Sequence, residues 1–103
     1  LIFDEIDAGI SGITADRVAR KLRLIGKSRQ VICITHLPQI AAAGDEHFLI
    51  HKEAENDSVT TQIELLDEEA AVKELSRILG GSKVTEHITE SAREMKQLAK
   101  SER

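Results

Sequence analysis

The sequence predicts an α/β fold in which a βαβ unit with parallel strands precedes an antiparallel hairpin and two C-terminal helices. Two short apolar runs, 1–3 and 30–35, stand on either side of a segment with helical periodicity, as in a βαβ unit. Two alternating segments, 47–53 and 58–66, enclose a turn, and two further helical patterns follow them. The 103 residues are enough for one domain.

The first half of the chain carries the expected βαβ unit. Residues 1–3 are expected to end a buried strand, and because termini are usually polar, we expect the natural chain to continue upstream. A helix is predicted within 13–28, with Asp16 in its first turn and Gly26 at its end. Its apolar stripe consists of Ala15, Val18, Leu22 and Ile25. The β-branched run 30–35 predicts a parallel strand covered on both faces.

The second half of the chain predicts a hairpin and two helices. The turn signal AENDS (54–58) separates the two alternating segments. One face of the second segment consists of Val59, Thr61, Ile63 and Leu65. A helix is predicted within 67–81, with Asp67 as its N-cap and glycine at its end. In the last helical segment, 84–100, one face consists of Val84, Ile88, Met95 and Leu98.

Composition and charge restrict the function classes. Aromatic residues make up only 2% of the chain, so it lacks the stacking platforms of many single-strand nucleic-acid binders. The formal net charge is −4, which is not the overall footprint of a DNA-binding module. Six basic and no acidic residues lie within 17–44, and seven acidic and no basic residues lie within 53–69. We interpret both stretches as solvated faces, although the basic segment 17–29 could contact a phosphate backbone.

Two adjacent carboxylates follow the first apolar run, in LIFDE. The carboxyl ends of strands are where α/β sheets place ligands. Adjacent strand residues point in opposite directions, so Asp4 and Glu5 are expected to have separate tasks. In a nucleotide hydrolase, Asp4 would hold Mg²⁺ through water and Glu5 would act as the general base on the attacking water. Taken alone, the same dipeptide could simply begin a loop.

A histidine follows the second apolar run, in VICITHLPQ. The ends of two parallel strands joined by a helix meet at one edge of the sheet, so His36 is expected beside the two acids. An imidazole there could donate a hydrogen bond to a terminal phosphate or to the attacking water. His47 and His51 are interpreted as surface histidines because four strand residues separate them too widely for one tight metal site. Cys33 is interpreted as a small core residue.

Together these motifs resemble those of ABC-type ATPases. LIFDE resembles a Walker B strand, IDAGISG the D-loop that follows it, and ITH the switch histidine. The sequence DEID resembles the corresponding motif of SMC-like proteins more closely than that of transporters. THLPQIAAAGDEHFLIHKE and ELSRILGG resemble the C-terminal end of the RecN family of bacterial DNA repair proteins. The resemblance covers essentially all of 1–103, which would form the C-terminal lobe segment of an ATPase head.

The resemblance implies an ATPase that uses ATP and Mg²⁺ as cofactors and acts in recombinational repair of double-strand breaks. Its expected partners are DNA ends, a second copy of the head and other recombination proteins, and no membrane is involved. Its expected location is the cytoplasm, in association with the nucleoid. Asp4 would assist Mg²⁺, Glu5 would activate water and His36 would contact the γ-phosphate. In the D-loop, Ser11, where most SMC-type heads carry Asp, and Gly12 would face the partner head.

Gln39, which follows the switch strand, would help to shape the nucleotide site. The sequence contains no GxxxxGK[ST] phosphate loop, no ABC signature and no coiled coil, so we expect this chain to be inactive towards ATP by itself and to expose apolar surface. Two alternatives stay open. The chain could belong to another ABC-type ATPase, such as a different SMC-like protein or a transporter, or it could be a non-catalytic α/β interaction module.

Overall fold

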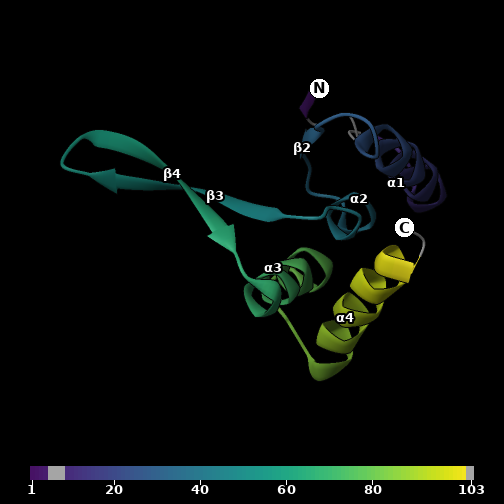
Figure 1. The fold of residues 1–103 in the computed structure, drawn as a ribbon. Coiled ribbons are helices and arrows are strands. Elements are labelled where there is room, and N and C mark those ends of the chain that lie inside the picture. The colour runs from purple at the N-terminus through teal and green to yellow at the C-terminus, as the bar shows by residue number, and fades with distance from the viewer. Residues whose placement is uncertain (5–8, 102–103) are drawn as a thin grey trace.

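The computed structural model describes residues 1–4 and 9–101, and it has an α/β architecture with two separate two-stranded sheets (Figure 1). The strands are β1 (Ile2–Asp4), β2 (Ile32–Ile34), β3 (His47–Glu55) and β4 (Ser58–Leu66). The helices are α1 (Gly12–Gly26), α2 (Pro38–Ala42), α3 (Glu68–Gly80) and α4 (Glu86–Ser101). The predicted order of strands and helices is confirmed, and α2 is an addition.

The βαβ unit is present as predicted, but its strands are not buried. Strands β1 and β2 pair in parallel, with Ile2 opposite Ile32 and Asp4 opposite Ile34. Cys33 packs into the core as expected. The prediction that both faces are covered is wrong, because Ile2 is 73% exposed and Ile32 is 50% exposed. Side chains alternate along each strand, so only the face that carries the central residues is covered.

Helix α1 begins one residue earlier than the sequence predicts and ends at Gly26. Ala15 of the expected apolar stripe is buried, and so is Ala19, which the predicted stripe did not include. The prediction that Asp16 lies in the first turn of this helix is wrong, since that turn contains no acidic residue. The reason is that Ser11 caps the helix, so the first turn ends before Asp16. The basic residues of α1 are mostly on its exposed side, as expected for a solvated face.

The core is divided into two small clusters that the short helix α2 connects. Ile40 and Ala43 pack with Ala19 of α1, while Ala42 packs with residues of α3 and α4. The residues of the second cluster are Ala42, Val72, Leu75 and Ala92. Helix α2 was not predicted from the sequence, because a five-residue helix is too short to show a helical period. This missed helix joins the two halves of the fold.

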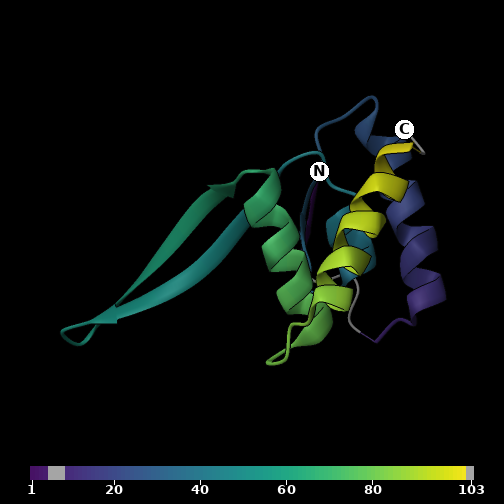
Figure 2. The same cartoon turned by 90° about the horizontal axis from the view of Figure 1, so that it is seen from below.

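The hairpin extends away from the helices, as both views show (Figures 1 and 2). Its antiparallel register, with Phe48 opposite Leu65 and Ile50 opposite Ile63, confirms the prediction. The turn uses Asn56 and Asp57, both with positive φ, as a two-residue hairpin turn requires. Its apolar face is uncovered in this chain, since Ile63 is 68% exposed, which agrees with the expected exposure of apolar surface.

The last two helices pack against each other, and the buried residues of α4 differ from those of its predicted apolar face. The N-cap of α3 is Asp67, as predicted, and Gly81 with φ 62° follows its end. On α4 the buried residues are Ala92, Lys96 and Ala99. Leu98, on the apolar face predicted for this helix, is 57% exposed. Alanines let the two helices approach closely, and a lysine stem covers the apolar surface beside them.

Candidate functional site

Two predicted site residues lie at one edge of the parallel strand pair. Asp4 is the last residue of β1 and lies opposite Ile34, the last residue of β2. His36 follows two residues later, and both Asp4 and His36 are exposed. Because the strands run in the same direction, a carboxylate and an imidazole lie beside the carboxyl ends of neighbouring strands. This arrangement can present an acid and a hydrogen-bond donor to the same ligand.

The predicted general base and the start of the predicted D-loop lie outside the described residues. Glu5 is the first of residues 5–8, which the structure leaves undescribed, so its role stays a prediction. The part of the loop that is described begins at Gly9, which has φ 80°, a conformation that favours glycine.

Ser11 caps the N-terminus of α1. Its hydroxyl oxygen accepts a hydrogen bond from the Thr14 backbone N–H at 3.4 Å, and the hydroxyl donates to Thr14 Oγ1 at 3.1 Å. Its backbone is extended, with φ −79° and ψ 166°, as expected of an N-cap. From the sequence, Ser11 was predicted only to face a partner head. Serine before a helical period is itself an N-cap signal, and it could have predicted this capping role.

Gln39 lies against the start of α1. A Cβ atom added to Gly12 would come within 3.2 Å of Gln39 Nε2, so the glutamine amide occupies the space beside this glycine. Its Oε1 is buried and has no hydrogen-bond partner. The segment that leads to Gln39 is held locally, because the Leu37 backbone N–H donates to Thr35 Oγ1 at 3.0 Å and Pro38 begins α2, the helix that contains Gln39. Of the predicted site residues that the structure describes, four lie on the two segments that follow β1 and β2: Ser11, Gly12, His36 and Gln39.

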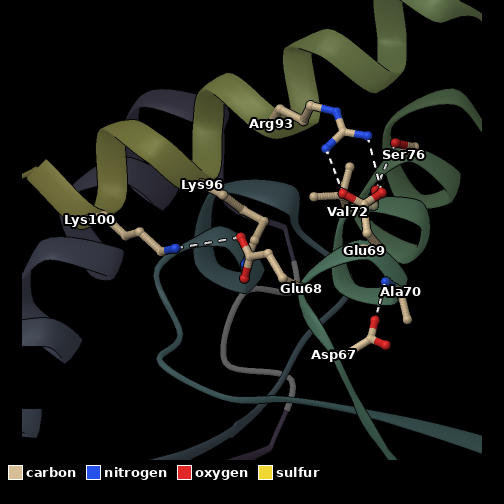
Figure 3. Close-up of polar contacts among 9 residues, drawn as sticks. All are labelled: Asp67, Glu68, Glu69, Ala70, Val72, Ser76, Arg93, Lys96 and Lys100. Atoms are coloured by element: carbon tan, nitrogen blue, oxygen red, sulfur yellow. Dashed lines mark hydrogen bonds and ion pairs between the residues drawn. The ribbon is translucent and has the colours of Figure 1, made fainter.

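The clearest electrostatic interactions lie elsewhere, between α3 and α4 (Figure 3). The guanidinium of Arg93 donates hydrogen bonds to both carboxylate oxygens of Glu69, at 3.0 and 3.2 Å. These hydrogen bonds and the positive charge lower the pKa of Glu69, and the carboxylate in turn raises the pKa of Arg93. A depression of about 280 Å³ between these helices is open to solvent and is lined by both side chains. It is a feature of helix packing and lies apart from the strand edge.

The two histidines of β3, His47 and His51, contact a backbone carbonyl oxygen and a carboxylate. His47 Nε2 donates to the Ala41 carbonyl oxygen at 2.8 Å, and His51 Nδ1 lies 3.9 Å from Glu53 Oε1. Within residues 1–4 and 9–101, no three His, Cys, Asp or Glu side chains form a group that could hold a metal ion. No helix in the same part of the chain is long and apolar enough to cross a membrane.

Comparison with known proteins identifies the relatives of this chain. It is 46% identical over 95 residues to a DNA repair protein RecN from Vibrio cholerae, and the match covers 92% of this chain and 17% of the relative. It is 44% identical over 101 residues to a DNA repair protein RecN from Halalkalibacterium halodurans, covering 98% of this chain and 18% of the relative.

A third relative is a DNA repair protein RecN from Bacillus subtilis, 40% identical over 92% of this chain and 16% of the relative. No family model matches the chain. The chain therefore spans about one sixth of the length of these curated relatives.

Proposed function

Because this chain is homologous over most of its length to a segment of the DNA repair protein RecN, we propose that it forms part of an ATP-hydrolysing head in a DNA repair protein. The observation that carries the proposal is the parallel register of β1 and β2, which aligns Asp4 with Ile34 and so brings Asp4 and His36 to one edge. The name of the relatives, DNA repair protein, suggests the process, and the residues at the strand edge suggest the ATP chemistry.

The residues at this edge fit a magnesium nucleotide. Mg²⁺ commonly binds one or two carboxylates together with the phosphates of its substrate, rather than a cage made by the protein alone. An exposed carboxylate at Asp4, with no group of three ligands in the described part of the chain, suits that mode. When bound, Mg²⁺ would neutralise charge on the phosphate oxygens. Asp4 is the residue that would hold it, through water.

The remaining roles follow from the residue types. Glu5 would take a proton from the attacking water, and His36 would donate a hydrogen bond to the terminal phosphate. Ser11 and Gly12 would face a second copy of the head across a homodimer, with the Ser11 hydroxyl already committed to capping α1. The sequence holds no phosphate loop, so the remainder of the full-length protein would supply the phosphate-binding amides. ATP-dependent closure of two heads would then control engagement of DNA ends.

The test is DNA-dependent ATP turnover by the full-length protein beside its Glu5→Gln and His36→Ala variants. We expect Glu5→Gln to bind ATP and to lose about 10²-fold or more in turnover, since a positioned base contributes that much. His87→Ala is the matched control because His87 is exposed on α4, far along the chain from the strand edge. It should turn over ATP like the wild type.

Three outcomes would count against the proposal. Equal turnover by the wild type and Glu5→Gln would show that Glu5 is not the base. A Glu5→Gln variant that loses stability but has no turnover to lose would favour a non-catalytic interaction module. Saturable binding of Mg-ATP at micromolar concentration by the 103-residue chain alone would contradict the need for a phosphate loop from elsewhere.

A further inference from the structure

The side of α1 that faces away from the core is positively charged. The basic face of α1 consists of Arg17, Arg20, Lys21 and the C-cap Lys27, all of which are exposed. Arg17 and Lys21 each follow a buried alanine by two residues, which is about 200° of helical rotation. Both cations therefore lie on the side of the helix opposite the core. Asp16 is the only acidic residue of α1, and no other acidic residue follows until Asp45.

Most of this positive charge is not neutralised by neighbouring carboxylates. On α3 and α4, ion pairs with glutamates are formed by Arg77, Arg93, Lys96 and Lys100. By contrast, Arg17, Lys21 and Lys27 form no ion pair with any residue in the described ranges 1–4 and 9–101. Arg17 and Lys21 are four residues apart, a spacing at which like charges weaken a helix and opposite charges stabilise it. This arrangement is expected where a negatively charged partner, rather than stability, requires the cations.

The acidic residues of the chain are concentrated away from α1. Seven acidic and no basic residues lie within 53–69, which includes the tip of the hairpin and the start of α3. The hairpin extends away from α1 in both views (Figures 1 and 2). The net charge of −4 therefore does not describe the surface of α1. Repulsion at the hairpin would orient the basic face of α1 towards a polyanion.

We propose that the basic face of α1 contacts the phosphate backbone of duplex DNA. The helix rises about 15 Å from Arg17 to Lys27. Duplex DNA carries one negative charge per about 1.7 Å of its axis, so several phosphates lie along that length. The chain has no Trp or Tyr to stack on bases, and contacts to phosphates carry no sequence information. This inference rests on the proposed engagement of DNA ends, which it deepens, and it does not require ATP hydrolysis.

A protein partner is the rival occupant of this face. Ile13 and Leu24 are exposed on the same side of α1, and apolar side chains among cations also suit an acidic protein surface such as the hairpin of a second copy. The two apolar residues are about 16 Å apart along the helix axis, which is too far for one continuous apolar patch. The cations between them therefore determine the character of the face, and they favour DNA.

The experiment measures binding of the full-length protein to a short blunt-ended DNA duplex, without nucleotide, as salt is raised from about 50 to 200 mM. Arg17→Gln combined with Lys21→Gln removes two cations, so the slope of log K against log salt should become shallower by about 2. Affinity at about 0.1 M salt should fall about 10-fold or more. The loss should be the same for duplexes of different sequence, because phosphates are the contacts.

The matched control is Lys73→Gln combined with Lys83→Gln, which removes the same charge at two exposed positions outside α1. Its affinity and salt slope should equal those of the wild type. Arg17→Lys combined with Lys21→Arg keeps both charges and should also bind like the wild type. Each variant should keep its melting temperature, because the substituted residues are exposed. If the first variant does not fold, Lys21→Gln combined with Lys27→Gln makes the same test.

Each other outcome decides the matter. Equal affinity and slope for the wild type and the first variant would overturn the inference, and so would a loss of affinity with an unchanged slope. An equal loss in the control would show a general effect of charge rather than a surface on α1. If DNA binding is kept but self-association changes in analytical ultracentrifugation, the face binds a second copy instead. A wild type that binds the duplex but does not hydrolyse ATP would remove the proposed hydrolysis, while the losses expected for the variants would still support this inference.

Discussion

Removal of the negative charge at Glu68 should destabilise the chain more than removal of the buried positive charge beside it. Lys96 of α4 is 5% exposed, and its Nζ lies 3.5 Å from Glu68 Oε2 at the start of α3 (Figure 3). Lys100 lies 3.6 Å from the other oxygen of the same carboxylate. Glu68 thus holds two cations close to the N-terminus of α3, where positive charge is disfavoured.

The size of the effect follows from distance and exposure. At 3.5 Å the attraction between unit charges is about 5 kcal/mol at an effective dielectric constant of about 20 and about 1 kcal/mol in water. The side chain of Glu68 is 59% exposed, so solvent screens the pair strongly. We expect Glu68→Gln to lower the free energy of unfolding by about 1–2 kcal/mol, because Lys96 then stays buried without its partner.

The opposite substitution has a different expected result. Lys96→Met keeps most of the apolar stem and removes the buried charge, while Glu68 retains Lys100 and water. We expect the free energy of unfolding to stay the same or to rise by up to about 1 kcal/mol, since apolar residues of similar size can replace a buried ion pair without loss of stability. Lys73→Met, at an exposed position of α3, is the control and should stay within about 0.5 kcal/mol of the wild type.

The assay is urea unfolding followed by far-UV circular dichroism, because the chain has no Trp or Tyr to report by fluorescence. With an m value of about 1–1.5 kcal/mol per molar urea, Glu68→Gln should lower the midpoint by about 1 M. The difference should shrink as salt is added. An unchanged midpoint for Glu68→Gln, or a larger loss for Lys96→Met than for Glu68→Gln, would refute the reasoning.

Three further predictions concern α3, α4 and the core between them. Hydrogen bonds from Arg93 and its positive charge lower the pKa of Glu69 below the ordinary value of 4.5. The pair therefore stabilises the fold fully at pH values above 4.5, and this stabilisation is lost as the pH falls through the lowered pKa. The stability difference between wild type and Glu69→Gln should therefore be larger at pH 7 than at pH 3 in urea unfolding; equal differences would contradict this assignment. Asp67→Ala should lower the free energy of unfolding by about 1 kcal/mol, because the Asp67 carboxylate accepts a hydrogen bond from the Ala70 backbone N–H at 2.8 Å and so caps α3. Asp67→Asn should retain most of that free energy, because asparagine is also a good N-cap. Leu75→Ala should lower the free energy of unfolding by about 2–5 kcal/mol, because Leu75 is only 4% exposed. Leu98→Ala should lower it much less, because Leu98 is 57% exposed. A similar loss for both variants would contradict this assignment of the core.

The candidate site was partly predictable from the sequence. Apolar runs on either side of a helical period predicted the parallel pair, and the direction of its strands predicted that Asp4 and His36 would lie at one edge. The contact between Gly12 and Gln39 was not predictable, because it depends on how α2 packs against α1. Helix α2 was itself missed, since five residues contain too little periodicity to detect.

The sequence by itself determined the features that depend on neighbouring residues. Asp67 caps α3, Asn56 and Asp57 form the hairpin turn, and Gly26 ends α1, because each depends on hydrogen bonds or dihedral angles within a few residues. Tertiary structure alone decided which apolar side chains are covered. Lys96 is buried and Leu98 exposed because the angle at which α4 crosses α3 is set by packing between segments far apart in the chain, and no local pattern contains that angle.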